Sequence, residues 1–184
     1  MNLLFLGQTV QVASELHRTL SPSGKITAPG REDLVLMDEK AVTDSLVATN
    51  PSMIVNAAAW TAVDAAEQQQ AEAERLNPGL PEQLAHYAAT SNARLVHYSS
   101  DYVYPGDGEK PWQENSPTGP LSHYGKTKLE GDEAIKQSGA NYLIFRTSWV
   151  YSARGNNFMK TMLRLAESKP ELNIVADQIG APTP

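Results

Sequence analysis

The stretch Met53-Ile-Val-Asn-Ala-Ala58 decides the fold, because it is short and almost continuously apolar. A second run of this kind, Tyr142-Leu-Ile-Phe-Arg-Thr147, lies much later in the chain. Strands covered on one face alternate between apolar and polar residues, whereas strands of a parallel sheet are buried on both faces and do not alternate. Both runs therefore predict strands of a parallel sheet.

Short apolar runs alternate with longer helical patterns on either side of these stretches. This alternation predicts right-handed crossovers and a single α/β domain over residues 1–184, a Rossmann-like doubly wound parallel sheet in three αβα layers. We expect a long loop over residues 104–122. The expected strands are residues 3–7, 25–28, 53–58, 94–99, 142–147 and 172–175. The expected helices are residues 11–20, 39–49, 80–90, 124–137 and 157–168.

Composition narrows the class of protein. The 184 residues are 41% hydrophobic and 20% charged, which is typical of one globular domain. The net charge of −6 and the lack of a basic block argue against nucleic-acid binding. The lack of cysteine excludes thiolate chemistry, and the four histidines have no metal-ligand spacing, so no metal site is expected. With no signal peptide or membrane-spanning run recognised, a cytoplasmic protein that does not bind membranes is expected.

The turn after the first strand is the first candidate site. Gly7 ends an apolar run and a helical pattern begins shortly afterwards, at Gln11. In dinucleotide-binding folds, the pyrophosphate lies at such a turn, against free N–H groups and the positive end of the helix dipole. The usual glycine pattern is only partly present, because its other positions are Val10 and Ala13. A plain strand-to-helix turn therefore remains an alternative for this motif alone.

Three further residues suggest acid–base chemistry. Tyr124 and Lys128 are four residues apart, so they share a helix face, and a nearby ammonium is expected to lower the pKa of the phenol. Such a phenol can protonate a carbonyl oxygen while hydride adds to the carbon. Ser100 lies at the carboxyl end of the fourth expected strand, where ligands of open α/β sheets bind, and could polarise that carbonyl. Each feature alone has an ordinary structural explanation, but the order and spacing of all three favour a reductase.

Several blocks resemble the dTDP-4-dehydrorhamnose reductases, which are extended short-chain dehydrogenase/reductases. The blocks begin at Asn56 (Asn-Ala-Ala-Ala-Trp-Thr-Ala-Val-Asp), His97 (His-Tyr-Ser-Ser-Asp-Tyr-Val), Tyr124 (Tyr-Gly-Lys-Thr-Lys-Leu-Glu-Gly), Phe145 (Phe-Arg-Thr-Ser-Trp-Val-Tyr), Gly155 (Gly-Asn-Asn-Phe) and Asp177 (Asp-Gln-Ile-Gly-Ala-Pro-Thr). The resemblance implies reduction of the 4-keto group of a dTDP-linked 6-deoxy-hexulose with NADPH or NADH, giving dTDP-L-rhamnose.

The resemblance also implies roles for individual residues. Tyr124 would be the proton donor, Lys128 would tune its pKa, and Ser100 would orient the carbonyl, while Arg31 could pair with a 2′-phosphate. The residues expected to bind the cofactor are Gly7, Thr9, Val10, Gln11, Val12, Arg31, Ala57, Ala58, Ala59, Ser99, Tyr124 and Lys128. Those expected near the nucleotide-sugar substrate are Asp101, Tyr102, Trp149 and Asn157.

The chain also departs from the family pattern. Val10 replaces a glycine beside the pyrophosphate, and Val35 stands where the family tends to have an acidic residue near the adenine, so NADPH affinity is expected to be weakened. The family continues past the block at Asp177, whereas this chain ends at Pro184. Most of the substrate side, and a surface that some members use to form homodimers, are therefore expected to be missing.

Two alternatives to a reductase stay open. One is a non-catalytic or truncated binding module, like the regulatory subunit of methionine adenosyltransferase, which shares this fold. The other is a related nucleotide-sugar epimerase or dehydratase. Binding of cofactor without turnover would favour the module.

Val10→Gly is expected to strengthen NADPH binding, because it removes a branched side chain from the loop that approaches the phosphates. Fluorescence titration of NADPH into both proteins measures the effect. Unchanged or weaker affinity would contradict this account of the loop.

Overall fold

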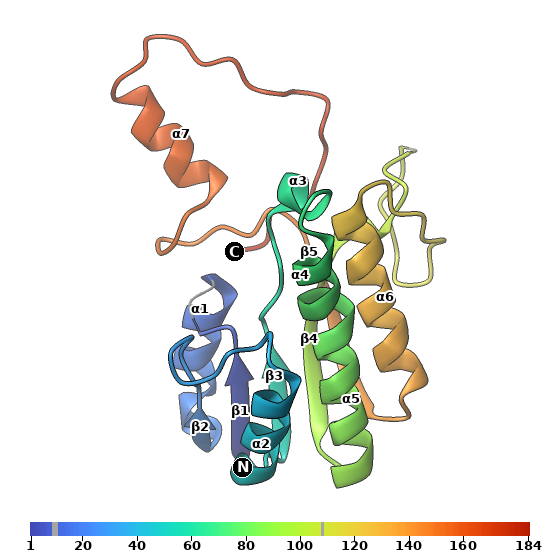
Figure 1. Ribbon diagram of the computed structural model, residues 1–184. Coiled ribbons are helices and arrows are strands. Elements are labelled where there is room, and N and C mark those ends of the chain that lie inside the picture. Colours follow the sequence, from blue (N-terminus) through green and yellow to red (C-terminus); the bar gives the residue numbers. More distant parts are fainter. Residues whose placement is uncertain (9–10, 108) are drawn as a thin grey trace.

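A computed structural model describes residues 1–8, 11–107 and 109–184 (Figure 1). Its centre is a five-stranded sheet in the order β2-β1-β3-β4-β5, and every neighbouring pair is parallel. This confirms the predicted Rossmann-like α/β class. The strands are β1 (Asn2–Leu6), β2 (Lys25–Thr27), β3 (Met53–Asn56), β4 (Arg94–Ser100) and β5 (Asn141–Thr147).

Helices lie on both sides of this sheet, with α2, α5 and α6 on one face and α1 on the other face beside β1 and β3 (Figure 1). One core cluster joins β1, β3 and β4 to α2, α5 and α6, and a second joins the other side of β1 and β3 to α1. The α-helices are α1 (Gln11–Leu20), α2 (Glu39–Thr49), α3 (Val63–Ala66), α4 (Gln70–Glu74), α5 (Leu80–Ser91), α6 (His123–Gln137) and α7 (Phe158–Ala166). Three short turns of other helical types are η1 (Ser21–Ser23), η2 (Arg75–Gly79) and η3 (Asp101–Val103).

Local sequence signals fix several helix ends. The Asp38 side chain accepts a hydrogen bond from the Ala41 N–H at the start of α2, as an N-cap does. Asn50 ends α2 in the left-handed region immediately before Pro51, which confirms the predicted stop. Ser122 caps α6 through the Gly125 N–H, so this helix begins one residue before Tyr124.

The sixth expected strand, residues 172–175, does not form. The run Leu-Asn-Ile-Val contains residues that favour strands, but an apolar run becomes a strand only when a neighbour pairs with it. Ile174 and Val175 are instead more than half exposed. The short helices α3 and α4 were also not expected, because their Ala-, Gln- and Glu-rich sequence has no strong periodic pattern.

The segment after β5 differs from the rest of the fold. In Figure 1, α7 stands apart from the sheet and its helical layers, and no residue of this helix is buried. The Tyr151 N–H donates to the Thr183 carbonyl and the Thr183 N–H donates to the Ser148 carbonyl, so the end of the chain returns to the edge of the sheet. In the described part of the chain, no helix is both long and apolar enough to cross a membrane.

Candidate active site

The candidate site lies where β4 ends and α6 begins. Parallel strands end at one edge of the sheet, so residues following β1, β3 and β4 meet there. A chain reversal at η3 and the loop to Ser122 bring α6 back to this edge. Gly125 makes the close approach of α6 possible, because a Cβ at this position would collide with the Tyr102 carbonyl oxygen.

Tyr124 is buried at the start of α6, with 9% of its surface exposed. Its ring and the Tyr102 ring form a T-shaped pair, with 5.5 Å between the ring centroids and an 80° angle between the planes. Burial raises the pKa of the phenol above its ordinary value, and a hydrogen bond with Ser100 opposes this rise. The lowering of the Tyr124 pKa expected from Lys128 is therefore not what the structure shows, because burial outweighs the groups that favour a phenolate.

Lys128 follows one turn later and is fully buried. Its Nζ donates to the Tyr98 carbonyl oxygen at 2.8 Å and lies 3.3 Å from His97 Nε2. Burial lowers the pKa of the amine to about 8, although the carboxylate of Asp132 acts in the opposite direction. A lysine with this pKa can exchange its proton at mildly alkaline pH.

Asp132 lies one further turn along α6 and is also buried. The Ser99 hydroxyl donates to its Oδ2 at 2.9 Å, and Arg146 Nε lies 3.4 Å from the same oxygen. Burial raises the pKa of this carboxyl, while Ser99, Lys128 and Arg146 lower it. Ser99 was expected to bind cofactor, and its hydroxyl here donates to Asp132, which links β4 to α6.

The turn after β1 lies directly beside the end of β3. The Ala57 N–H donates to the Leu6 carbonyl at 3.0 Å, and Ala58 is buried next to it. Gly7 has φ +95°, and a Cβ there would lie 2.6 Å from the Ala58 nitrogen. The backbone at Gly7 thus lies close to the backbone of Ala57 and Ala58, and together they form one surface. All three residues were expected to bind the cofactor.

Gly7→Ala is expected to lower the free energy of unfolding by about 1–2 kcal/mol, because a side chain at positive φ is strained and its Cβ meets the backbone of Ala57 and Ala58. Urea unfolding measures the loss. Gly139→Ala is the matched control, because Gly139 also has positive φ (+76°) but a Cβ added there would meet nothing within 4 Å. Equal losses in the two variants would show that the close approach at Gly7 does not matter.

The other residues expected at the cofactor have mixed positions. Gln11 and Val12 line a hollow with Tyr98, Thr147 and Thr183, about 200 Å³ in volume. Thr9 and Val10 lie outside the described residues. Ala59 is half-buried, whereas Arg31 and Val35 are exposed on the segment between β2 and α2.

The residues expected near the substrate fall into two groups. Asp101 and Tyr102 follow Ser100 directly, and the Asp101 carboxylate accepts hydrogen bonds from Ser100 Oγ (3.2 Å) and Ser148 Oγ (2.6 Å). Trp149 is half-exposed with φ +46° on the segment after β5. Asn157 caps α7, and its Nδ2 donates to Gln11 Oε1 at 3.0 Å. An expected substrate residue thus contacts an expected cofactor residue.

Asn56 and His97 were not singled out from the sequence as site residues. They are register partners on β3 and β4, both are fully buried, and Asn56 Nδ2 lies 3.1 Å from His97 Nδ1. His97 could have been singled out because it lies on the same strand as Ser100, three residues earlier, and that strand faces α6. For Asp132, the signal is its four-residue spacing from Lys128.

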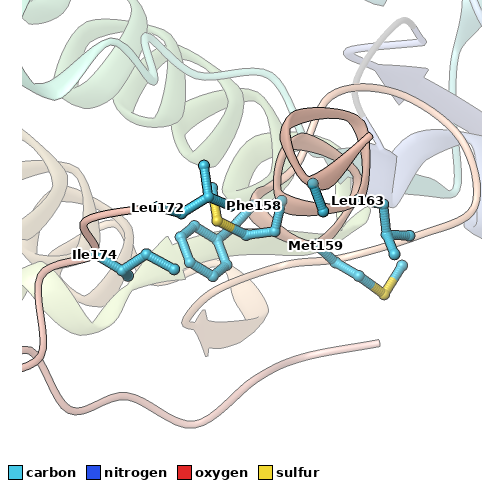
Figure 2. Close-up of a pocket in the computed structure, with 7 residues that line it drawn as sticks. Phe158, Met159, Leu163, Leu172 and Ile174 are labelled. Carbon is cyan, nitrogen blue, oxygen red and sulfur yellow. The ribbon is translucent and has the colours of Figure 1, made fainter. Parts of the chain in front are cut away.

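A larger apolar hollow lies elsewhere, between α7 and the segment that follows it. Figure 2 shows the Phe158 ring directed toward Leu172 and Ile174. No residue expected from the sequence to bind cofactor or substrate lines this hollow, and its lining is entirely apolar. It therefore offers no acid–base chemistry, and the candidate active site stays at the ends of β1, β3 and β4.

Comparisons with known proteins identify the family to which the chain is related. The RmlD substrate binding domain family matches residues 1–184. The dTDP-4-dehydrorhamnose reductase of Salmonella typhimurium is 47% identical over the whole chain, and that of Escherichia coli K12 is 46% identical. The chain spans 62% of the length of each of these two relatives.

Solved structures give the same result. A dTDP-4-dehydrorhamnose reductase from Clostridium acetobutylicum matches 100% of this chain and 65% of its own, with a TM-score of 0.94 and 37% identity. A Bacillus anthracis dTDP-4-dehydrorhamnose reductase, solved in complex with NADP, matches 98% of this chain and 65% of its own, with a TM-score of 0.92 and 34% identity. The chain therefore belongs to the RmlD substrate binding domain family and is a homologue of the dTDP-4-dehydrorhamnose reductases.

Proposed function

We propose that this chain carries the cofactor-binding and proton-donating part of an NADPH- or NADH-dependent reductase. Its substrate would be the 4-keto group of a dTDP-linked 6-deoxy-hexulose, and its product dTDP-L-rhamnose. The observation that carries the proposal is that Ser100, at the carboxyl end of β4, lies beside Tyr124, and that Tyr124 and Lys128 are both buried one turn apart on α6. Membership of the family supports the substrate class.

The residues at the β1 turn fit a dinucleotide. Gly7 lets the backbone approach closely at Ala57 and Ala58, and α1 begins at Gln11, where the first turn of a helix has N–H groups without partners inside the helix. Gln11 and Val12 would contact the bound cofactor from the hollow that they line. When bound, the cofactor supplies a hydride to the keto carbon.

The proton would come from Tyr124. Because burial raises its pKa, the phenol is protonated at neutral pH, which is the state that a proton donor needs. Ser100 lies beside this phenol, and its hydroxyl, which donates to the Asp101 carboxylate in this structure, would turn to donate to the keto oxygen of a bound substrate. Lys128, with a pKa of about 8, would return a proton to Tyr124 after the reaction.

The test is a titration followed by a turnover assay. NADPH fluorescence is followed as the purified chain is added, and the keto-sugar is then supplied while NADPH consumption is measured. Saturable binding with conversion to the 4-hydroxy sugar supports the proposal. Saturable binding without consumption favours a binding module, and lack of binding overturns the proposal.

A further inference from the structure

A buried line of polar groups runs from the end of β3 to Lys128. The Ala58 N–H donates to Asn56 Oδ1 at 3.2 Å, and Asn56 Nδ2 lies 3.1 Å from His97 Nδ1. On its other side, the imidazole Nε2 lies 3.3 Å from Lys128 Nζ, which also donates to the Tyr98 carbonyl at 2.8 Å. The Asn56, His97 and Lys128 residues are at most 1% exposed, so the line is shielded from bulk solvent.

The direction of each bond follows from the backbone. The Ala58 N–H can only donate, so the amide oxygen of Asn56 must face it and the amide nitrogen must face His97. That nitrogen is also a donor, so His97 Nδ1 accepts. A neutral imidazole that accepts at Nδ1 carries its hydrogen on Nε2, and this N–H points at the Lys128 amine.

The direction of the hydrogen bond from His97 affects whether the Lys128 amine is charged. An ammonium group has only donors, whereas an uncharged amine has a lone pair that can accept from Nε2–H. We propose that His97 is a positioning residue for Lys128: fixed by Asn56, it presents an N–H to the amine and favours its uncharged form. The inference deepens the proposed function, because it assigns a device that sets proton supply at the same site.

The other ionisable groups around the Lys128 amine each affect the balance between its charged and uncharged forms. On α6, Asp132 favours the charged amine, and Tyr124 lies one turn before Lys128; from β5, Arg146 reaches Asp132. On β4, burial and the charge of Lys128 lower the pKa of His97 well below 6.5, so the imidazole stays neutral. Burial lowers the pKa of Lys128 to about 8, so an N–H of His97 facing the amine would act in the same direction as burial.

The first test reads the tautomer of His97 directly. In the 184-residue chain labelled with ¹⁵N-histidine, long-range ¹H–¹⁵N NMR at about pH 9, above the Lys128 pKa, should show His97 as the Nε2–H tautomer. The spectrum of His97→Gln assigns the signal. An Nδ1–H tautomer or a charged ring would overturn the inference.

The second test reverses which groups donate and which accept in the hydrogen bonds between Asn56, His97 and Lys128. In Asn56→Asp, the carboxylate accepts from both the Ala58 N–H and His97 Nδ1, so Nε2 would present a lone pair to the amine. The pKa of Lys128, followed by NMR of ¹³Cε-labelled lysine and assigned with Lys128→Met, should then rise by about one unit or more. A direct effect of the new charge is separated by repeating the substitution in His97→Leu, where the rise should be much smaller.

An equal rise in both backgrounds would overturn the role of His97. None of these measurements needs cofactor or keto-sugar, so they can fail while the reductase assay succeeds, or the reverse. The tautomer is read in the unsubstituted chain, so the inference remains testable even if a variant does not fold.

Discussion

Tyr124→Phe is expected to lower turnover of the keto-sugar by about 10²–10⁴-fold, because it removes the hydroxyl that would give its proton to the keto oxygen. The ring itself stays, so its packing against Tyr102 and the start of α6 should be kept. NADPH affinity should change much less than turnover, because the phenylalanine keeps the ring and leaves Gly7, Ala57 and Ala58 unchanged. The assay measures turnover at saturating NADPH, with the dissociation constant taken from fluorescence.

Tyr142→Phe is the matched control for this substitution. Tyr142 lies on β5 with 37% of its surface exposed, and the same hydroxyl is removed there without touching the candidate site. This control should retain full turnover. If Tyr124→Phe also kept its turnover within a few-fold, Tyr124 would not be the proton donor and a different group would have to protonate the product.

The sheet could be predicted from the sequence because its information is mostly local. Residues 53–58 and 142–147 are largely apolar, and both runs contain a strand where one was expected. Burial on both faces holds for β3 but is wrong for β5, where Ile144 packs against the core cluster while Leu143 and Phe145, on the opposite face, are exposed. Residues 172–175 remain unpaired. Whether an apolar run finds a neighbour or a covering layer depends on the rest of the fold, and local sequence does not contain that information.

Some features of the candidate site could likewise be predicted from local sequence, and others could not. The placement of Tyr124 and Lys128 on one face follows from helix geometry, so a four-residue spacing was enough to propose it. The Asn56–His97 contact depends on the register of β3 against β4, which the two segments do not reveal separately. The pKa of Tyr124 could not be predicted from the nearby lysine, because its direction is set by burial beneath the η3 segment and Tyr102.

Lys128→Met is expected to remove a dependence of stability on pH. The amine has a pKa of about 8 in the folded chain and 10.5 as the ordinary value, so between these pH values the unfolded chain holds more protons. The free energy of unfolding therefore rises with pH across this window, by about 3 kcal/mol in total for this fully buried group. Below pH 8 both states are charged, and the full cost of burying the charge is present.

The measurement is urea unfolding of both proteins at several pH values from about 7 to 10. Lys128→Met should have its greatest stability relative to the unsubstituted chain at the low end and lose that advantage as pH rises. The window stops near pH 10 because Tyr124 and Tyr98, whose pKa values are raised by burial, make the folded state less favourable above it. Lys126→Met, which removes an exposed lysine from the same helix, should keep the original pH dependence. If Lys128→Met kept it as well, the amine would not be carrying a buried charge, and its proposed role in returning a proton to Tyr124 would lose its physical basis.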